Sequence, residues 1–202
     1  MTTATLARSP SSPRAPVQES GIRPRVDWSL LLGAWSAAYV LPHLYWALGG
    51  EAFLFTVKES AAEMDDWKAI NWAASVVLTG AALLGPALVV SASHPRLRRV
   101  TLAACAAGAA IATSHGAFGI LYRALNVTGV TDVEGAEFDA SSHEWVLWDL
   151  FVFEPWFLIE GLLFIAAGAA VLKTARDRRR WVTGCLAAAG LATMTGLLGL
   201  RF

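Results

Sequence analysis

The sequence has few charged residues and only two cysteines. Of its 202 residues, 16% are charged and 55% are hydrophobic, and the mean hydropathy is +0.49. Soluble domains carry about 25% charged residues, so the composition predicts a membrane protein. Cys105 and Cys185 form no Cys-x-x-Cys pair, which argues against a disulfide scaffold, a zinc site and a thiol-disulfide redox enzyme. We expect both to be small buried apolar residues.

The common nucleotide and catalytic motifs are also missing. There is no Walker loop, dinucleotide fingerprint, nucleophile elbow or kinase signature, which argues against nucleotide-driven transport and serine hydrolysis by the usual designs. The formal net charge is zero, so no basic footprint points to nucleic acid. We therefore predict no cofactor and no nucleic-acid partner.

Five apolar stretches follow a polar N-terminal segment. Residues 1–26 are rich in Ser, Pro and Arg, and we predict a disordered cytoplasmic tail there, with a transit peptide as the alternative. The apolar stretches, within a domain of residues 27–202, are 28–48, 69–91, 100–124, 145–172 and 181–200. Each is long enough to cross about 30 Å of hydrocarbon as a helix, and none alternates like a barrel strand. The prediction is an all-α bundle of five transmembrane helices in the cell membrane.

Charge placement predicts the orientation of this bundle. Twelve of the sixteen positive residues lie on one side: Arg8, Arg14, Arg23 and Arg25, then Arg96, Arg98 and Arg99, then Lys173, Arg176, Arg178, Arg179 and Arg180. The positive-inside rule places this side and the N-terminus in the cytoplasm, and the C-terminus outside. Acidic residues are concentrated in the two outer loops, 49–68 and 125–144. They are either ordinary solvated groups or a collar for a cation or substrate at the mouth of a cavity.

The fourth apolar stretch contains three carboxyl groups, Asp149, Glu154 and Glu160. A charged carboxylate in mid-membrane costs about 2.5 to 3.5 kcal/mol, so these residues need a paired or cavity-lining role. On a straight helix Asp149 and Glu160 lie within about 20° of each other, whereas Glu154 lies about 140° around. Pro155 predicts a kink in this helix, because it removes one helical hydrogen bond. Aromatic residues on the Asp149 side complete a predicted acidic and aromatic stripe: Trp145, Phe153 and Trp156.

Neighbouring stretches supply partners for these acids. Arg123 is placed to pair with Asp149 or Glu154, and His115 with Glu160. The first stretch brings Tyr39, His43 and Trp46 to its outer half at helical spacing, and the third adds Tyr122. The alternative for each histidine is a hydrogen-bonded packing residue. Because no His-x-x-x-His or Glu-x-x-His pair is present, we predict no metal ligand.

Two segments resemble a known family. His43 to Gly50, which reads HLYWALGG, and Phe153 to Phe157, which reads FEPWF and is followed by Gly161, resemble a widespread bacterial family of small polytopic membrane proteins of unknown function. The likeness extends over the first four stretches. In that family Asp-Pro-Trp is usual at Glu154-Pro155-Trp156, so the resemblance implies a retained carboxyl group at Glu154, while Glu160 is not a family feature. A weaker similarity, without an aligned motif, is to small integral-membrane terpene cyclases.

The first functional hypothesis is an intramembrane acid/base enzyme acting on an isoprenoid or similar lipid. A protonated carboxyl group can protonate an olefin or epoxide, and aromatic faces can stabilise a carbocation. The predicted catalytic residues are Glu154 as proton donor or base, Asp149 and Glu160 as its counterparts, and His43 and His115. The predicted substrate-binding residues are Tyr39, Trp46, Tyr122, Arg123, Trp145, Phe153 and Trp156. Membrane lipids and a hydrophobic small molecule would be its partners.

The second hypothesis is a non-catalytic scaffold or accessory subunit of a larger membrane complex, either as a homo-oligomer or with other chains. In this case Arg123 and the histidines would only neutralise the buried acids. A third hypothesis, ion or proton permeation through an oligomer, ranks lower because no stretch has a polar face along its whole length.

Overall fold

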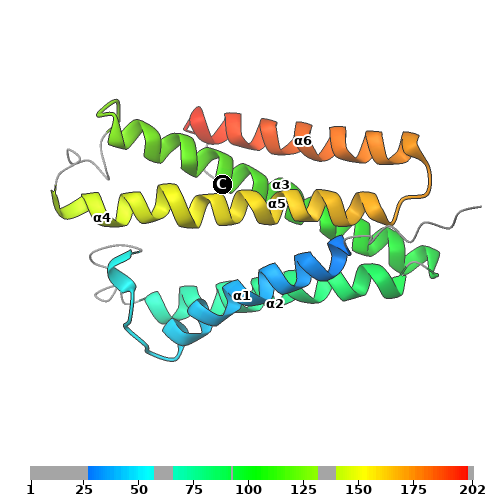
Figure 1. Ribbon diagram of the computed structural model, residues 1–202, viewed down its shortest axis with the longest axis horizontal. Coiled ribbons are helices and arrows are strands. Elements are labelled where there is room, and N and C mark those ends of the chain that lie inside the picture. The colour runs from blue at the N-terminus through cyan, green and yellow to red at the C-terminus, as the bar shows by residue number, and fades with distance from the viewer. Residues whose placement is uncertain (1–26, 57–65, 92, 132–139, 200–202) are drawn as a thin grey trace, which may run out of the picture.

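The chain folds into helices. The computed structural model describes residues 27–56, 66–91, 93–131 and 140–199, and this part of the chain contains no strand (Figure 1). The helices are α1 (Trp28–Ala47), η1 (Leu54–Thr56), α2 (Trp67–Ser91), α3 (Pro95–Val127), α4 (Ala140–Trp148), η3 (Asp149–Phe153), α5 (Glu154–Ala170) and α6 (Ala175–Leu197). Because α4, η3 and α5 follow one another without a break, they form one continuous helix. The prediction of an all-α protein is confirmed for the described residues.

Three helical segments are long and apolar enough to cross a membrane. Among the described residues they are Trp67–Ser91, Pro95–Val127 and Glu144–Ala170. The helix α1 is only 20 residues long and contains Trp, Tyr, His and Ser, which lower its hydropathy, and α6 begins with arginines. The count of five spans, the orientation and the cell membrane therefore stay predictions. The predicted disordered tail and most acidic residues of the two loops lie outside the described residues.

A side-chain cap marks the start of α1, and a proline in the first turn marks the start of α3. The carboxyl group of Asp27 accepts hydrogen bonds from the backbone N–H groups of Ser29 and Leu30 at the start of α1. Pro95 occupies the first turn of α3, where its missing N–H has no cost. The predicted third stretch, 100–124, is consequently extended at its start by a turn that contains three arginines.

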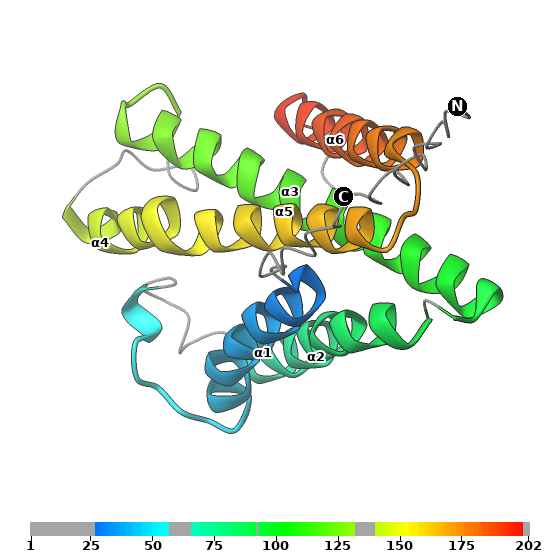
Figure 2. The same ribbon diagram turned by 45° about the vertical axis from the view of Figure 1, so that its right-hand side comes forward.

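The helices form two layers. Helices α1 and α2 lie side by side, and α3, α5 and α6 form the other layer (Figures 1 and 2). The helix α5 contacts both α1 and α3, so it occupies the centre of the molecule. Buried residues from both layers form the main core, among them Leu32, Leu88, Phe164 and the free thiols Cys105 and Cys185. The predicted burial of both cysteines is confirmed.

The central helix contains one wide turn. Residues Asp149–Phe153 adopt π-helical geometry, and the N–H of Glu154 donates to the carbonyl of Asp149, five residues back. The next residue is Pro155, whose ring would collide with the carbonyl of residue 151 in a regular α-helix. A π turn moves that carbonyl away and inserts one residue into the helical register. The expected disturbance at Pro155 is therefore a π turn that directly precedes it.

Candidate functional site

The three carboxyl groups of the central helix meet two different neighbours. Asp149 and Glu154 face α3, where Arg123 Nε lies 2.8 Å from Asp149 Oδ2 and His115 Nε2 lies 3.7 Å from Glu154 Oε2. Glu160 faces α1 and accepts a hydrogen bond of 2.5 Å from the Ser36 hydroxyl group. The prediction that His115 pairs with Glu160 is wrong, because the histidine lies against Glu154 instead.

The π turn explains why Asp149 faces the same helix as Glu154. In a straight α-helix Asp149 and Glu154 would point about 140° apart, but one inserted residue removes about 100° of that rotation. The two acids are thereby brought to within about 40° of each other on the side of α3. The same rotation separates Asp149 from Glu160 by about 80°. The expectation of one stripe containing Asp149 and Glu160 is corrected for this reason.

Two glycines of α3 make room for Glu154. A Cβ atom at Gly119 would overlap the carboxyl group of Glu154, and one at Gly116 would overlap the backbone at Glu154 and Leu158. The carboxyl group therefore lies directly against the backbone of α3, and Glu154 as a whole residue is only 7% exposed. Its Oε2 atom has no hydrogen-bond partner among the described residues. Burying an oxygen atom without a hydrogen-bond partner costs free energy, so its position needs a structural or functional explanation.

His115 connects this buried acid to the outer surface of the helical layer. Its side chain is 55% exposed, against 10% for Glu154. The imidazole ring packs against Phe157 with 4.4 Å between ring centroids. At 3.7 Å the His115–Glu154 contact is longer than a hydrogen bond. His115 is therefore the exposed member of the pair, while Oε2 of Glu154 is buried without a hydrogen bond among the described residues.

Asp149 is held in a separate polar cluster. Besides its ion pair with Asp149, Arg123 donates a 3.3 Å hydrogen bond from Nη1 to Asn126 Oδ1. Its guanidinium group also lies over the rings of Trp145, at 4.7 Å, and Tyr122, at 5.4 Å. Arg123 was predicted to pair with Asp149 or Glu154, and in the structure it pairs with Asp149. This carboxylate is neutralised by its partner, which distinguishes it from Glu154.

Aromatic residues of α1 stack on aromatic residues of α5. Trp156 stacks on Trp35 with 4.1 Å between centroids and on Tyr39 with 5.3 Å. The Trp35 indole also donates to the carbonyl of Trp156 at 3.3 Å, and Tyr39 meets Phe157 edge-on. Trp35 and Ser36 are not among the predicted site residues. The spacing of Trp35, Tyr39 and His43 by four residues is a signal that predicts their shared face.

His43 is oriented by a buried amide that the sequence analysis did not single out. Asn71 is 1% exposed, and its Nδ2 donates to the carbonyl of Trp67 at 2.8 Å. Its Oδ1 therefore faces His43 Nδ1 at 2.8 Å and accepts a hydrogen bond from it. In the neutral ring Nε2 is then the free acceptor. An amide inside the apolar stretch 69–91 is the signal that could have identified Asn71.

The remaining predicted residues lie around other aromatic groups. The indole of Trp46 donates to the carbonyl of Ala52 at 2.9 Å, and its ring packs against Trp67. Phe153 stacks against Trp148 with 6.4 Å between centroids. These contacts place Trp46 near the end of α1 and Phe153 within the π turn. Among the described residues, no group of three His, Cys, Asp or Glu side chains is arranged to hold a metal ion.

The fold and the buried acids define a helical protein with segments able to cross a membrane. A family model described as "Protein of unknown function (DUF3995)" matches residues 36–164, more than half of the chain. The chain belongs to this family, as the resemblance to a family of unknown function predicted. The matched region runs from Ser36 to Phe164 and contains all three carboxyl groups, whereas α6 lies outside it. No curated protein and no solved structure matches the chain.

Proposed function

We propose that this protein is an intramembrane acid/base enzyme acting on an isoprenoid or another lipid-soluble molecule. The observation that carries the proposal is the pair of Glu154 and His115. One partner is a buried acid whose Oε2 atom is unbonded among the described residues, and the other is an exposed histidine 3.7 Å away. Asp149 and Glu160 have partners of their own, so Glu154 is the acid best placed to exchange a proton.

The two groups suit a reaction that adds one proton and removes another. The carboxylic acid of Glu154 donates its proton to an olefin or epoxide, which becomes a carbocation or an opened epoxide cation. Neutral His115 then removes a proton from a neighbouring carbon, which forms the new double bond. Return of that proton from His115 to Glu154 restores the starting state, so the net reaction is an isomerisation or cyclisation without a co-reactant.

The surroundings of the pair support a lipid-soluble substrate. The side chain of His115 is on the exposed surface of α3, one of the helices long and apolar enough to cross a membrane. A molecule dissolved in the bilayer would reach it without entering water. Phe157 packs against His115 and Tyr39 packs against Phe157, and such ring faces stabilise a positive charge in a hydrophobic substrate.

A change of Glu154→Gln tests the proposal. The amide has nearly the same volume but cannot donate the proton, so we expect the host's lipid and isoprenoid profile to match that of cells lacking the protein. The profile would be measured by mass spectrometry of total lipid extracts, with protein abundance measured in parallel. The matched control is Glu144→Gln, an exposed carboxyl group on the same continuous helix. Equal profiles for wild type and Glu154→Gln, at equal abundance, would contradict the proposal.

A non-catalytic scaffold is the second candidate, and one observation favours it. Asp149 and Glu160 are both bonded to a neighbouring helix, to Arg123 and Ser36 respectively, so these acids act as links between helices. If holding helices together is their purpose, Arg123→Ala leaves Asp149 charged and unpaired and should lower the amount of assembled protein severalfold. Size-exclusion chromatography of a fluorescent fusion measures this amount, and an unchanged peak would count against the scaffold.

A further inference from the structure

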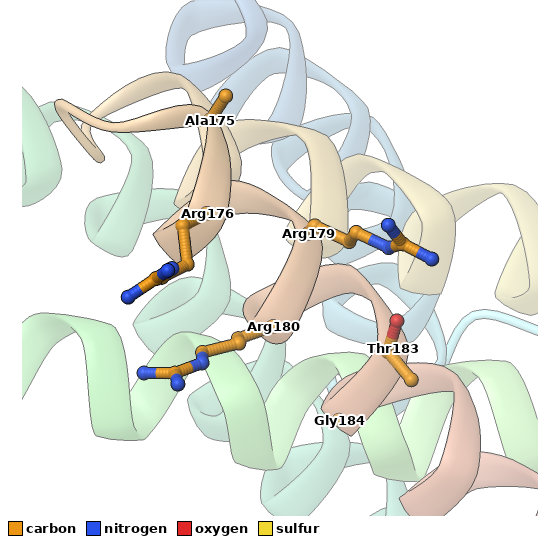
Figure 3. A pocket seen from close by; sticks show the side chains of 6 residues that line it. All are labelled: Ala175, Arg176, Arg179, Arg180, Thr183 and Gly184. Carbon is orange, nitrogen blue, oxygen red and sulfur yellow. The ribbon is translucent and has the colours of Figure 1, made fainter.

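A shallow surface hollow lies along one side of the first turns of α6, separate from the carboxyl groups. It has a volume of about 710 Å³ and is lined by Ala175, Arg176, Arg179, Arg180, Thr183 and Gly184. These positions follow helical spacing and share one side of α6. Figure 3 shows Arg176 and Arg180 reaching to one side of the hollow and Arg179 to the other. The hollow is thus bordered by three guanidinium groups.

The charge of these arginines is not balanced by a carboxylate in the described part of the chain. The ion pairs there involve His115 and Arg123, both on α3. The acid nearest in sequence, Asp177, is engaged with Thr174 in the cap of α6. Arg178 donates to the carbonyl of Leu172, which lies in the connection just after α5. Arg178 therefore has a structural role. Asp177 contributes one negative charge, so Arg176, Arg179 and Arg180 leave a net positive charge around the hollow.

An exposed apolar face continues from the hollow along α6. Gly184 has nothing within 4 Å of where a Cβ would stand. Ala187, Ala188 and Leu191 follow it at helical spacing and are all exposed. The indole of Trp181, one turn before Gly184, donates to the carbonyl of Ile165 at 2.9 Å, which holds α6 against α5. The charged hollow and the apolar face together match a molecule with an anionic head and a hydrocarbon tail.

We propose that this surface of α6 binds an anionic phospholipid. Arg176, Arg179 and Arg180 contact the headgroup phosphate, because guanidinium groups form paired, charge-assisted hydrogen bonds with phosphate oxygens. One acyl chain lies along the face from Gly184 to Leu191. The net negative charge of the lipid compensates the three arginines, which a zwitterionic lipid cannot do. This binding is independent of the chemistry at Glu154.

Lipid titration of the purified full-length protein in neutral detergent tests the site. Native mass spectrometry would give the apparent Kd for phosphatidylglycerol, with phosphatidylcholine and inorganic phosphate as comparison probes. The variant R176Q/R179Q/R180Q should raise the Kd for phosphatidylglycerol about tenfold or more. The matched control, R96Q/R98Q/R99Q, removes three positive charges from the first turns of α3 and should change the Kd less than twofold.

A second variant tests the acyl-chain contact without changing charge. Gly184→Leu fills open space on an exposed helical position and favours the helix, so the protein should fold while phosphatidylglycerol binds severalfold more weakly. Equal loss in both arginine triples would show general charge attraction and overturn the proposal. Equal affinity for phosphatidylcholine, or unchanged binding by Gly184→Leu, would overturn it as well. If inorganic phosphate competes fully at millimolar concentration, the site binds a free anion, not a lipid.

Discussion

At the residue scale, Glu154 depends on the absence of a side chain at Gly119. The carboxyl group occupies the space that a Cβ of residue 119 would fill. Asp149 and Glu160, by contrast, are satisfied by side chains that reach toward them. Glu154 therefore needs a residue without a side chain on α3, whereas Asp149 and Glu160 each need a side-chain hydrogen-bond donor. Glu154 is thus the acid whose buried Oε2 has no hydrogen-bond partner among the described residues, and for this reason it is the one we propose for proton exchange.

Adding one methyl group at Gly119 should displace Glu154. We expect Gly119→Ala to destabilise the protein by about 1 to 3 kcal/mol, because the carboxyl group or the helix must move. Thermal melting in detergent, followed by tryptophan fluorescence, measures the effect. The control is Gly190→Ala on α6, where nothing lies within 4 Å of the new Cβ, and where alanine should be neutral or stabilising. Equal melting temperatures for Gly119→Ala and wild type would contradict the tight contact.

At the element scale, the π turn brings Asp149 to the same neighbouring helix as Glu154. A regular helix through residues 149–153 would point Asp149 and Glu154 in different directions. The wide turn at Asp149–Phe153 turns both toward α3. Pro155 favours it locally, since its ring excludes the regular position of the carbonyl four residues earlier. The π turn thus sets the direction of Asp149 relative to Glu154.

Removing one residue from this turn should undo the alignment. Deletion of Phe151 restores a regular helical register and rotates Asp149 by about 100° away from Arg123 relative to Glu154. We expect less assembled protein and a lower melting temperature, as for Arg123→Ala. Phe151→Ala is the control, because this side chain is 69% exposed and its loss leaves the register unchanged. If deletion and control melt alike, the turn does not position the acids.

At the scale of the whole molecule, the Ser36–Glu160 hydrogen bond joins the two layers. Glu160 is 2% exposed and Ser36 is fully buried. The bond accompanies the stack of Trp35 and Trp156, which also connects α1 to α5. Because the two residues are buried together between layers, each depends on the other for its hydrogen bond.

Ser36→Ala tests how much this link contributes. It leaves a buried carboxyl group without its donor, and we expect a loss of about 1 to 3 kcal/mol in the free energy of unfolding. Ser114→Ala serves as the control, since that hydroxyl group only bonds back to the carbonyl of Ile111 on its own helix. Denaturation of both variants in mixed micelles, monitored by circular dichroism, would make the comparison. A change no larger than in the control would show that the layers do not need this bond.

Much of the fold and part of the site could be predicted from the sequence. The helical class follows from the long apolar stretches. Asp149, Glu154 and Glu160 can be identified as candidate site residues because a charge in hydrocarbon is costly. The pairing of Arg123 with Asp149 was one of two predicted alternatives. The shared direction of Asp149 and Glu154 could not be predicted, because the rotation introduced by the π turn is absent from a straight-helix projection. The partners of His115 and Glu160 depend on how α3 and α1 pack against α5, which spacing along one helix does not determine.

The sequence by itself determined that the chain is helical, that apolar stretches dominate it and that three acids lie in one of them. These properties depend on local composition and on spacing along one helix. Only the tertiary structure decided that Glu154 lies against Gly119 with His115 beside it, and that Glu160 bonds to Ser36. These contacts depend on how helices are rotated and packed against one another, and small residues and one wide turn control that packing from positions far apart in the chain.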